Sequence, residues 1–269
     1  MEVQKRSTIT NGLRSLSSYL KKLQRSGDDY IRLNIESANR LKNMKASIAS
    51  KLANDKYKKK AHSKPHLIDD IKGKVYECEK IRSLGTLREK LVFSSGDPES
   101  DIMFIGEAPG YEEELKGMPF VGPSGQLLTK IINAMGLNRE DVYISNIVKF
   151  RPLIEGPDQG TSNRKPSSEE MSVSLPYILD EIEVVKPKVA VALGGTAMQG
   201  LLSINGPLSS ARGKIHDAHG YKTIVTYHPS YLLRSKSPNK DKRKLWEDML
   251  MAMQILGLNI SEKQKNYFK

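Results

Sequence analysis

The sequence predicts an α/β protein, a three-layer α/β/α sandwich with a central, mainly parallel four-stranded sheet and a basic helical N-terminal extension. From about residue 66, short apolar runs typical of buried strands alternate with amphipathic segments of helical spacing. Charge separates the two parts, because residues 1–65 contain 16 Lys/Arg and 5 Asp/Glu, whereas the rest of the chain contains 27 and 26.

The N-terminal extension has helical periodicity. Leucines recur at three- and four-residue spacing in residues 13–23, and a second apolar series follows in residues 41–52. "KYKKKAHSKP" (56–65) is typical of a linker, and Pro65 is expected to end any helix there. We therefore expect residues 1–65 to form a basic helical extension and linker, and residues 66–269 to form the α/β domain.

Each element of the α/β domain has its own signal. Four apolar runs predict strands within residues 102–105, 141–148, 188–193 and 222–227. Helices are expected between and after them, within residues 124–136, 167–186, 196–203 and 241–257. Ser124 is expected to cap the first of these helices, and "SSEE" opens the second with a capping signal.

Composition limits the partners and the location. The basic extension favours a polyanion or a protein partner, although a solvated tail is the alternative. One cysteine excludes an intramolecular disulfide and an all-cysteine metal site within the chain. No apolar run is long enough to cross a membrane, and the first residues lack a signal-peptide core. We expect an intracellular monomer, in the cytoplasm, or in the nucleus if the source is eukaryotic or viral.

Unusual residues follow every predicted strand. They are Gly106, Glu107 and Gly110 after the first, Asn146 after the second, Gly194 to Thr196 after the third, and His228 to Ser230 after the fourth. Because the carboxyl ends of parallel strands meet at one edge, these groups are expected to form one site. Each residue alone also has a structural interpretation: a solvated Glu, a turn-capping Asn, a structural His and, for Phe120, a core position.

Six motifs together resemble family 4 uracil-DNA glycosylases. They are "GEAPGYEEELKGMPFVGPSGQLL", "YISNIVKFRP", "NRKPSSEE", "KPKVAVALGGTA", "SSARG" and "TYHPSYLLR", in the family's order and spacing. The resemblance covers roughly residues 75–257 and leaves the N-terminal extension outside. It implies hydrolysis of the N-glycosidic bond of deoxyuridine in DNA, after the target nucleotide leaves the duplex.

The resemblance also implies roles for individual residues. Glu107, His228 and Asn146 match catalytic positions, where Glu107 would orient or deprotonate water and His228 would donate to uracil O2. The expected uracil-binding residues are Gly106, Phe120, Asn146 and His228, with Phe120 stacking on the base. The expected DNA-binding residues are Gly122, Ser124, Gly125, Arg212, Ser230 and Arg234.

The chain departs from the family at its iron–sulfur cluster. The family's four cysteine positions are occupied here by Cys78, Ile81, Phe150 and Ser174. We therefore expect no cluster and no other metal, with Ile81 and Phe150 filling the vacated volume by apolar packing. A second departure is the longer link "LIEGPDQGTS" (153–162), typical of a surface loop.

Two alternatives to uracil excision remain open. One is a non-catalytic or weakly active DNA-binding or replication accessory protein with the same fold. The other is a glycosylase for another deaminated base, such as hypoxanthine or xanthine.

Removing residues 1–65 is expected to reduce the salt sensitivity of DNA binding, because the basic extension would release fewer counterions. The measurement is the slope of log affinity against log salt concentration for the whole chain and the truncated chain. Equal slopes would mean that these charges do not contact DNA.

Overall fold

The computed structural model describes residues 63–156 and 159–268, all within the unit Ala61–Lys269. The helices predicted in residues 13–52 lie outside the described residues. Within them, the helices are α3 (Lys64–Glu77), α4 (Glu79–Arg82), α5 (Tyr111–Lys116), α6 (Pro123–Ala134), α7 (Ser168–Val185), α8 (Gly195–Leu202), α9 (Leu208–Ala211), α10 (Pro229–Arg234), α11 (Pro238–Leu256) and α12 (Glu262–Lys265). A 3-10 turn covers Arg139–Asp141.

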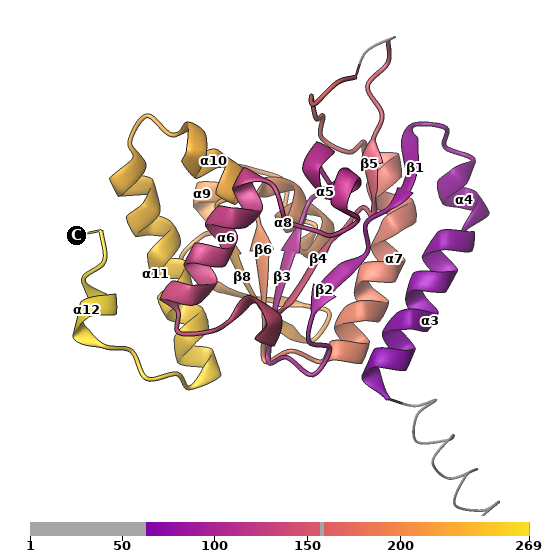
Figure 1. The fold of residues 1–269 in the computed structure, drawn as a ribbon. Coiled ribbons are helices and arrows are strands. Elements are labelled where there is room, and N and C mark those ends of the chain that lie inside the picture. Colours follow the sequence, from indigo (N-terminus) through magenta and orange to yellow (C-terminus); the bar gives the residue numbers. More distant parts are fainter. Residues whose placement is uncertain (1–62, 157–158, 269) are drawn as a thin grey trace, which may run out of the picture. The chain divides into compact units, whose positions relative to one another are not determined.

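A central sheet organises the domain (Figure 1). In the described residues it has six strands in the order β2-β4-β3-β6-β8-β7. They are β2 (Ser94–Gly96), β3 (Ile102–Gly106), β4 (Tyr143–Asn146), β6 (Val189–Leu193), β7 (Ile215–Ala218) and β8 (Tyr221–Thr226). The four predicted strands form the central parallel part β4-β3-β6-β8, which confirms the mainly parallel sheet.

The expectation of four strands was too low. Antiparallel β2 and β7 extend the sheet at its two edges, and β1 (Leu87–Leu91) pairs with β5 (Phe150–Pro152) in a separate two-stranded ribbon. Each of these strands is short, and β1, β2 and β7 lack a continuous buried run. Short strands of this kind form because a neighbouring strand pairs with them. Their sequences therefore need not contain the apolar run from which a strand is predicted.

Alternation along the strands gives the domain two cores. Ile102 and Phe104 of β3 face α6 and α11, whereas Met103 and Ile105 face the core that includes α3, α7 and α8. Successive side chains of a strand point to opposite faces, so a fully apolar strand requires cover on both. The predicted three-layer α/β/α arrangement is therefore confirmed.

Several helix boundaries differ from those expected. Pro65 lies in the first turn of α3, where its missing N–H costs nothing, instead of ending a helix. Helix α6 is preceded by Gly122 as its N-cap and has Pro123 in its first turn, so Ser124 does not cap it. The capping box predicted from "SSEE" is confirmed, with Ser167 and Glu170 bonding reciprocally at the start of α7.

A buried ion pair connects α7 to the sheet. Lys149 and Glu181 are fully buried and in contact, and Lys149 Nζ also donates to Ser145 Oγ at 2.5 Å. Glu181 accepts from Ser145 Oγ at 2.8 Å and from Tyr143 OH at 2.9 Å. Burial raises the pKa of Glu181 and lowers that of Lys149, while the opposite charge of each partner counteracts the shift. The donors around Glu181 compensate for its lost hydration.

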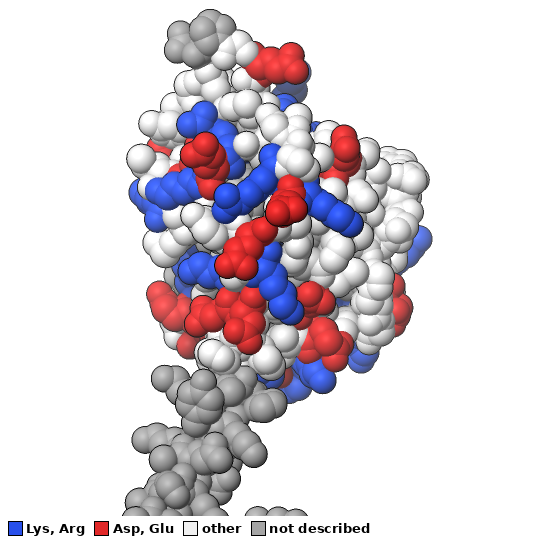
Figure 2. All heavy atoms as spheres, turned by 90° about the vertical axis from the view of Figure 1, so that its right-hand side faces the viewer, with Lys and Arg blue, Asp and Glu red and all other residues white. Residues whose placement is uncertain are grey.

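Surface charge on the domain is mixed. Figure 2 shows the side that lies on the right in Figure 1, where Lys and Arg side chains are interspersed with Asp and Glu. Among the described residues, no helix combines the length and the apolar character needed to span a membrane.

Replacing Lys149 by Met is expected to lower the free energy of unfolding by about 3–5 kcal/mol, because it leaves Glu181 buried without its cation. Denaturant unfolding measures this change. The control is Lys188→Met, which breaks an exposed 2.7 Å pair with Asp101 and is expected to cost about 0–1 kcal/mol. Equal losses in the two variants would contradict the argument.

Candidate active site

The carboxyl ends of the parallel strands bring the predicted residues to one edge of the sheet. Gly106 of β3 is in register with Asn146 of β4, and Leu193 of β6 is in register with Thr226 of β8. The residues that follow these strands, Glu107 and His228 among them, therefore share this edge. The expected convergence of the strand ends on one edge is confirmed by this register.

Gly106, Asn146 and Phe120 are in close contact. A Cβ atom on Gly106 would lie 2.3 Å from Asn146 Oδ1 and 2.5 Å from the Phe120 ring, so only glycine fits between them. Asn146 is 1% exposed, and its Oδ1 has no hydrogen-bond partner among the described residues. Leaving a buried acceptor unpaired costs about 1–3 kcal/mol, and a ligand N–H could remove that cost.

The Phe120 ring lies against Gly106, and the residue has an unusual backbone conformation. Its φ is +52°, in the left-handed region that costs a non-glycine residue about 1–2 kcal/mol. The centre of its ring is 5.7 Å from that of His228, with the planes inclined at 31°. A Cβ on Gly125 would lie 1.8 Å from the Phe120 carbonyl oxygen, so Gly125 supports the loop by close backbone packing.

His228 is neutral, and its tautomer follows from its hydrogen bonds. Burial, together with the charge of Arg234, lowers its pKa to about 4. Its Nδ1 lies 3.1 Å from the backbone N–H of Ser230, which can only donate, so Nδ1 is the acceptor and Nε2 carries the proton. The ring is the N-cap of α10, which fixes its orientation.

Glu107 is partly buried beside α8. Burial raises the pKa of its carboxyl group, while a hydrogen bond from the Thr196 side chain and the charge of Lys165 act in the opposite direction. A carboxylate with a raised pKa accepts a proton more readily than one in water. Thr196 was among the residues noted at the third strand end, but its contact with Glu107 required the tertiary structure.

The residues expected to bind DNA have different surroundings. Ser124 is partly exposed near the start of α6, Arg234 is exposed at the end of α10, and the Ser230 Oγ lies 2.8 Å from His228 Nδ1. Arg212 differs, since it is mostly buried, pairs with Asp248 at 2.7 Å and lies over the Tyr227 ring. Its charge is thus already neutralised within the protein.

The four positions of the family's iron–sulfur ligands do not form a suitable ligand set. Ile81 and Phe150 are buried in one apolar core, Cys78 packs against that core, and Ser174 is fully buried. Ser174 Oγ has no hydrogen-bond partner among the described residues. Such clusters require thiolates, and two of these side chains are hydrocarbon. Among the described residues, no group of three or more His, Cys, Asp or Glu could hold a metal ion.

Two contacts near the pocket were not anticipated from the sequence. Glu113 Oε1 accepts hydrogen bonds from the backbone N–H groups of Val121 and Gly122, both at 2.8 Å. Arg139 donates to the Pro119 carbonyl oxygen at 2.7 Å. Three consecutive glutamates precede this loop, and no local pattern indicates which of them turns inward.

Comparison with known proteins agrees with this geometry. Residues 93–250, more than half of the chain, match the model of the uracil DNA glycosylase superfamily. The chain is 37% identical over 199 residues to the type-4 uracil-DNA glycosylase of Thermotoga maritima, covering 72% of this chain and 97% of that protein. It is 38% identical over 193 residues to the type-4 enzyme of Saccharolobus solfataricus, covering 67% and 85%.

The chain is also similar to a type-5 uracil-DNA glycosylase, at lower identity. The type-5 uracil-DNA glycosylase of Thermus thermophilus is 28% identical over 184 residues, covering 61% of this chain and 79% of that protein. The extent of these matches and the arrangement of the pocket lead to one conclusion. The chain belongs to the uracil DNA glycosylase superfamily.

Proposed function

We propose that the protein excises uracil from DNA by hydrolysing the N-glycosidic bond, leaving an abasic site. The observation that carries the proposal is the buried Oδ1 of Asn146, which has no hydrogen-bond partner in the described part of the chain and lies, with the Phe120 ring, against Gly106. The names of the type-4 relatives support the same activity. A base inside a duplex cannot reach such a pocket, so the target nucleotide must be flipped out.

Asn146 and Phe120 would recognise the flipped base. The Asn146 Oδ1 would accept from uracil N3–H, and its amide NH₂ would donate to O4. Cytosine offers an acceptor at N3 and a donor at N4, so both contacts would be lost with it. The Phe120 ring would stack on the base, a contact worth about 1–3 kcal/mol per base.

His228 would stabilise the departing base. Because Nδ1 accepts from the Ser230 N–H, the Nε2–H is free to point toward uracil O2. Breaking the bond between C1′ and N1 leaves its electron pair on the base, and negative charge gathers at O2. A neutral imidazole that donates to this oxygen would lower the energy of the transition state.

Glu107 would act on the sugar side of the bond. Its carboxylate would orient a water molecule toward C1′ and accept the proton as the new C1′–O bond forms. Its negative charge would also favour the positive charge that develops on the sugar. The Thr196 side chain, which bonds to Glu107, would hold the carboxylate in place.

The DNA strand would be held at the rim of the pocket. The start of α6 at Gly122 and Ser124, together with Ser230 and Arg234 on α10, offers polar or cationic groups for phosphate contacts. Arg212 is assigned here to a supporting role instead, because Asp248 already pairs with it.

We also propose that this chain holds no iron–sulfur cluster. The resemblance to family 4 implies an iron–sulfur cluster held by four cysteine thiolates. This chain has a single cysteine. Ile81 and Phe150 in the apolar core support replacement of the cluster by packing. In the proposed reaction no step depends on the cluster.

A single-stranded oligonucleotide with one deoxyuridine is expected to be cut at that position after incubation with the protein and alkali. Asn146→Ala and His228→Ala are expected to lose at least about tenfold in kcat/KM with folding intact, since each removes a contact made to the leaving base. No strand cleavage with the wild-type protein would refute the proposed function and favour a non-catalytic DNA-binding role. If the protein excised hypoxanthine or xanthine faster than uracil, its main substrate would be that base.

The same assay across pH tests Glu107. Because the proposed role needs the ionised carboxylate, activity should fall as the pH drops through its raised pKa. In the Glu107→Gln variant, whose remaining activity should be much lower, this acidic limb should disappear.

The purified protein is expected to be colourless and to contain no stoichiometric iron, because the donor set cannot ligate a cluster. Iron analysis and the visible absorption spectrum measure this directly. A brown protein with about four iron atoms per chain would overturn the proposal. Activity that persists after chelation and reduction would agree with a reaction independent of metal.

A further inference from the structure

The three consecutive glutamates of α5 have three different environments. Glu112 is half-buried, and its carboxylate lies 3.7 Å from Lys116 Nζ in an i,i+4 pair. Glu113 turns toward the loop that carries Phe120. Glu114 turns the other way and accepts from Arg88 at 2.5 Å and Arg151 at 2.9 Å. The short helix therefore connects two separate parts of the domain.

Glu113 holds the backbone immediately after Phe120. One carboxylate oxygen accepts from both Val121 N–H and Gly122 N–H at 2.8 Å. Bonds from neutral donors to a charged acceptor are roughly twice as strong as bonds between neutral groups. A Cβ on Gly110 would lie 2.8 Å from the second oxygen, so the glycine at the start of α5 leaves room for this carboxylate.

The backbone before Phe120 is held by a second side chain, Arg139. Arg139 donates to the Pro119 carbonyl oxygen at 2.7 Å and to Thr129 Oγ1 at 3.1 Å. Phe120 itself, with φ at +52°, adopts a conformation that its surroundings must stabilise. A cation on one side and a carboxylate on the other thus fix the loop on both flanks of the ring.

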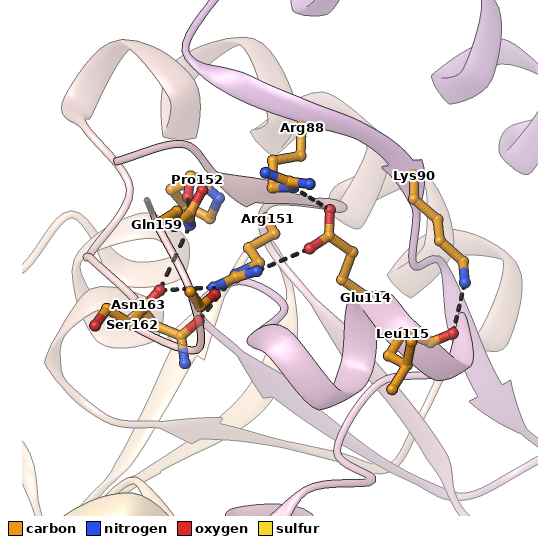
Figure 3. Close-up of polar contacts among 10 residues, drawn as sticks. Arg88, Lys90, Glu114, Leu115, Arg151, Pro152, Gln159, Ser162 and Asn163 are labelled. Atoms are coloured by element: carbon orange, nitrogen blue, oxygen red, sulfur yellow. Dashed lines mark hydrogen bonds and ion pairs between the residues drawn. The ribbon is translucent and has the colours of Figure 1, made fainter. Parts of the chain in front are cut away.

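The position of α5 is in turn fixed by the ribbon formed by β1 and β5 (Figure 3). Arg88 and Lys90 of β1 reach α5, where Lys90 Nζ donates to the Leu115 carbonyl oxygen at 2.6 Å. Arg151 of β5 links Glu114 to the loop after that strand, through Gly160 O at 2.9 Å and Ser162 O at 2.7 Å. These contacts anchor the helix from which Glu113 reaches the loop.

We infer that Glu113 is a positioning residue for Phe120: by binding the two N–H groups after it, Glu113 holds the ring ready to stack on the flipped base. The inference rests on the proposed function, since it concerns the ring that would contact uracil. A preorganised ring loses less conformational entropy when the base arrives. Glu113 itself would not touch the substrate.

A double-mutant cycle tests the coupling between the two residues. Single-turnover excision of uracil from a single-stranded oligonucleotide is measured for wild type, Glu113→Ala, Phe120→Ala and the double variant. Losing a stacking contact corresponds to a decrease of about 5- to 150-fold in the single-turnover rate at subsaturating protein. The rates of both single variants should be reduced by a factor in that range. If Glu113 acts through Phe120, the double variant should be within about twofold of Phe120→Ala. Losses that multiply would overturn the inference.

Matched variants separate positioning from stability. Glu113→Gln retains an acceptor oxygen at the same reach and should recover most of the lost rate, whereas Glu112→Gln should leave the rate unchanged. Equal losses in Glu113→Gln and Glu113→Ala would contradict the role of the two N–H bonds. If Glu113→Ala does not fold, Glu113→Asp, one methylene shorter, replaces it in the cycle.

The outcomes distinguish this inference from the proposed function. Wild-type protein that excises no uracil would refute both. Wild-type protein that excises uracil, combined with independent effects of Glu113 and Phe120, would refute only the positioning role.

Discussion

The parallel pairing of β3 with β4 and β6 is the constraint on which the pocket depends. Its register sets Gly106 beside Asn146, and the missing side chain of Gly106 admits both the amide and the Phe120 ring. A shift of one residue would turn every side chain of β3 to the opposite face. The two apolar cores on either side of β3 therefore fix the geometry of the site as well as the fold.

Charged groups support this geometry from behind the pocket. Lys149 and Glu181 are buried under β4, next to the strand end that carries Asn146. Removing one member of such a pair is costly, although replacing both by apolar groups can be neutral. The presence of the pair is therefore not in itself a net gain in stability over apolar packing. Arg151 and Glu114 act in the same way around α5.

On the proposal that this chain holds no cluster, apolar packing would do its structural work. A cluster joins distant segments by covalent bonds, whereas Ile81 and Phe150 lie in one apolar core and would join the same segments by packing. Apolar packing depends on volume and tolerates many combinations of side chains. The proposed replacement does not explain the buried Ser174, whose hydroxyl has no partner among the residues that the structure describes.

Much of this protein could be predicted from its sequence. Local patterns predicted the apolar runs of the four parallel strands and the capping box of Ser167 and Glu170, and the structure confirms both. They also placed Gly106, Asn146 and His228 at or just after strand ends, where the structure has them. These predictions succeed because each parallel strand contains a short apolar run, and because each of the three residues lies at or just after a strand end. The edge strands β2 and β7 and the ribbon strand β1 were missed, since pairing partners define them.

Tertiary structure alone decided how individual charged and polar side chains are used. Nothing in the sequence separates Glu113, which holds the Phe120 loop, from its neighbours Glu112 and Glu114. The sequence likewise contains no sign that Arg212, which is expected to bind DNA, pairs with Asp248. The sequence by itself determined the four parallel strands and the residues at their ends, because hydrophobic periodicity is local. The partner of each charge is a distant residue, and only the folded chain brings the two together.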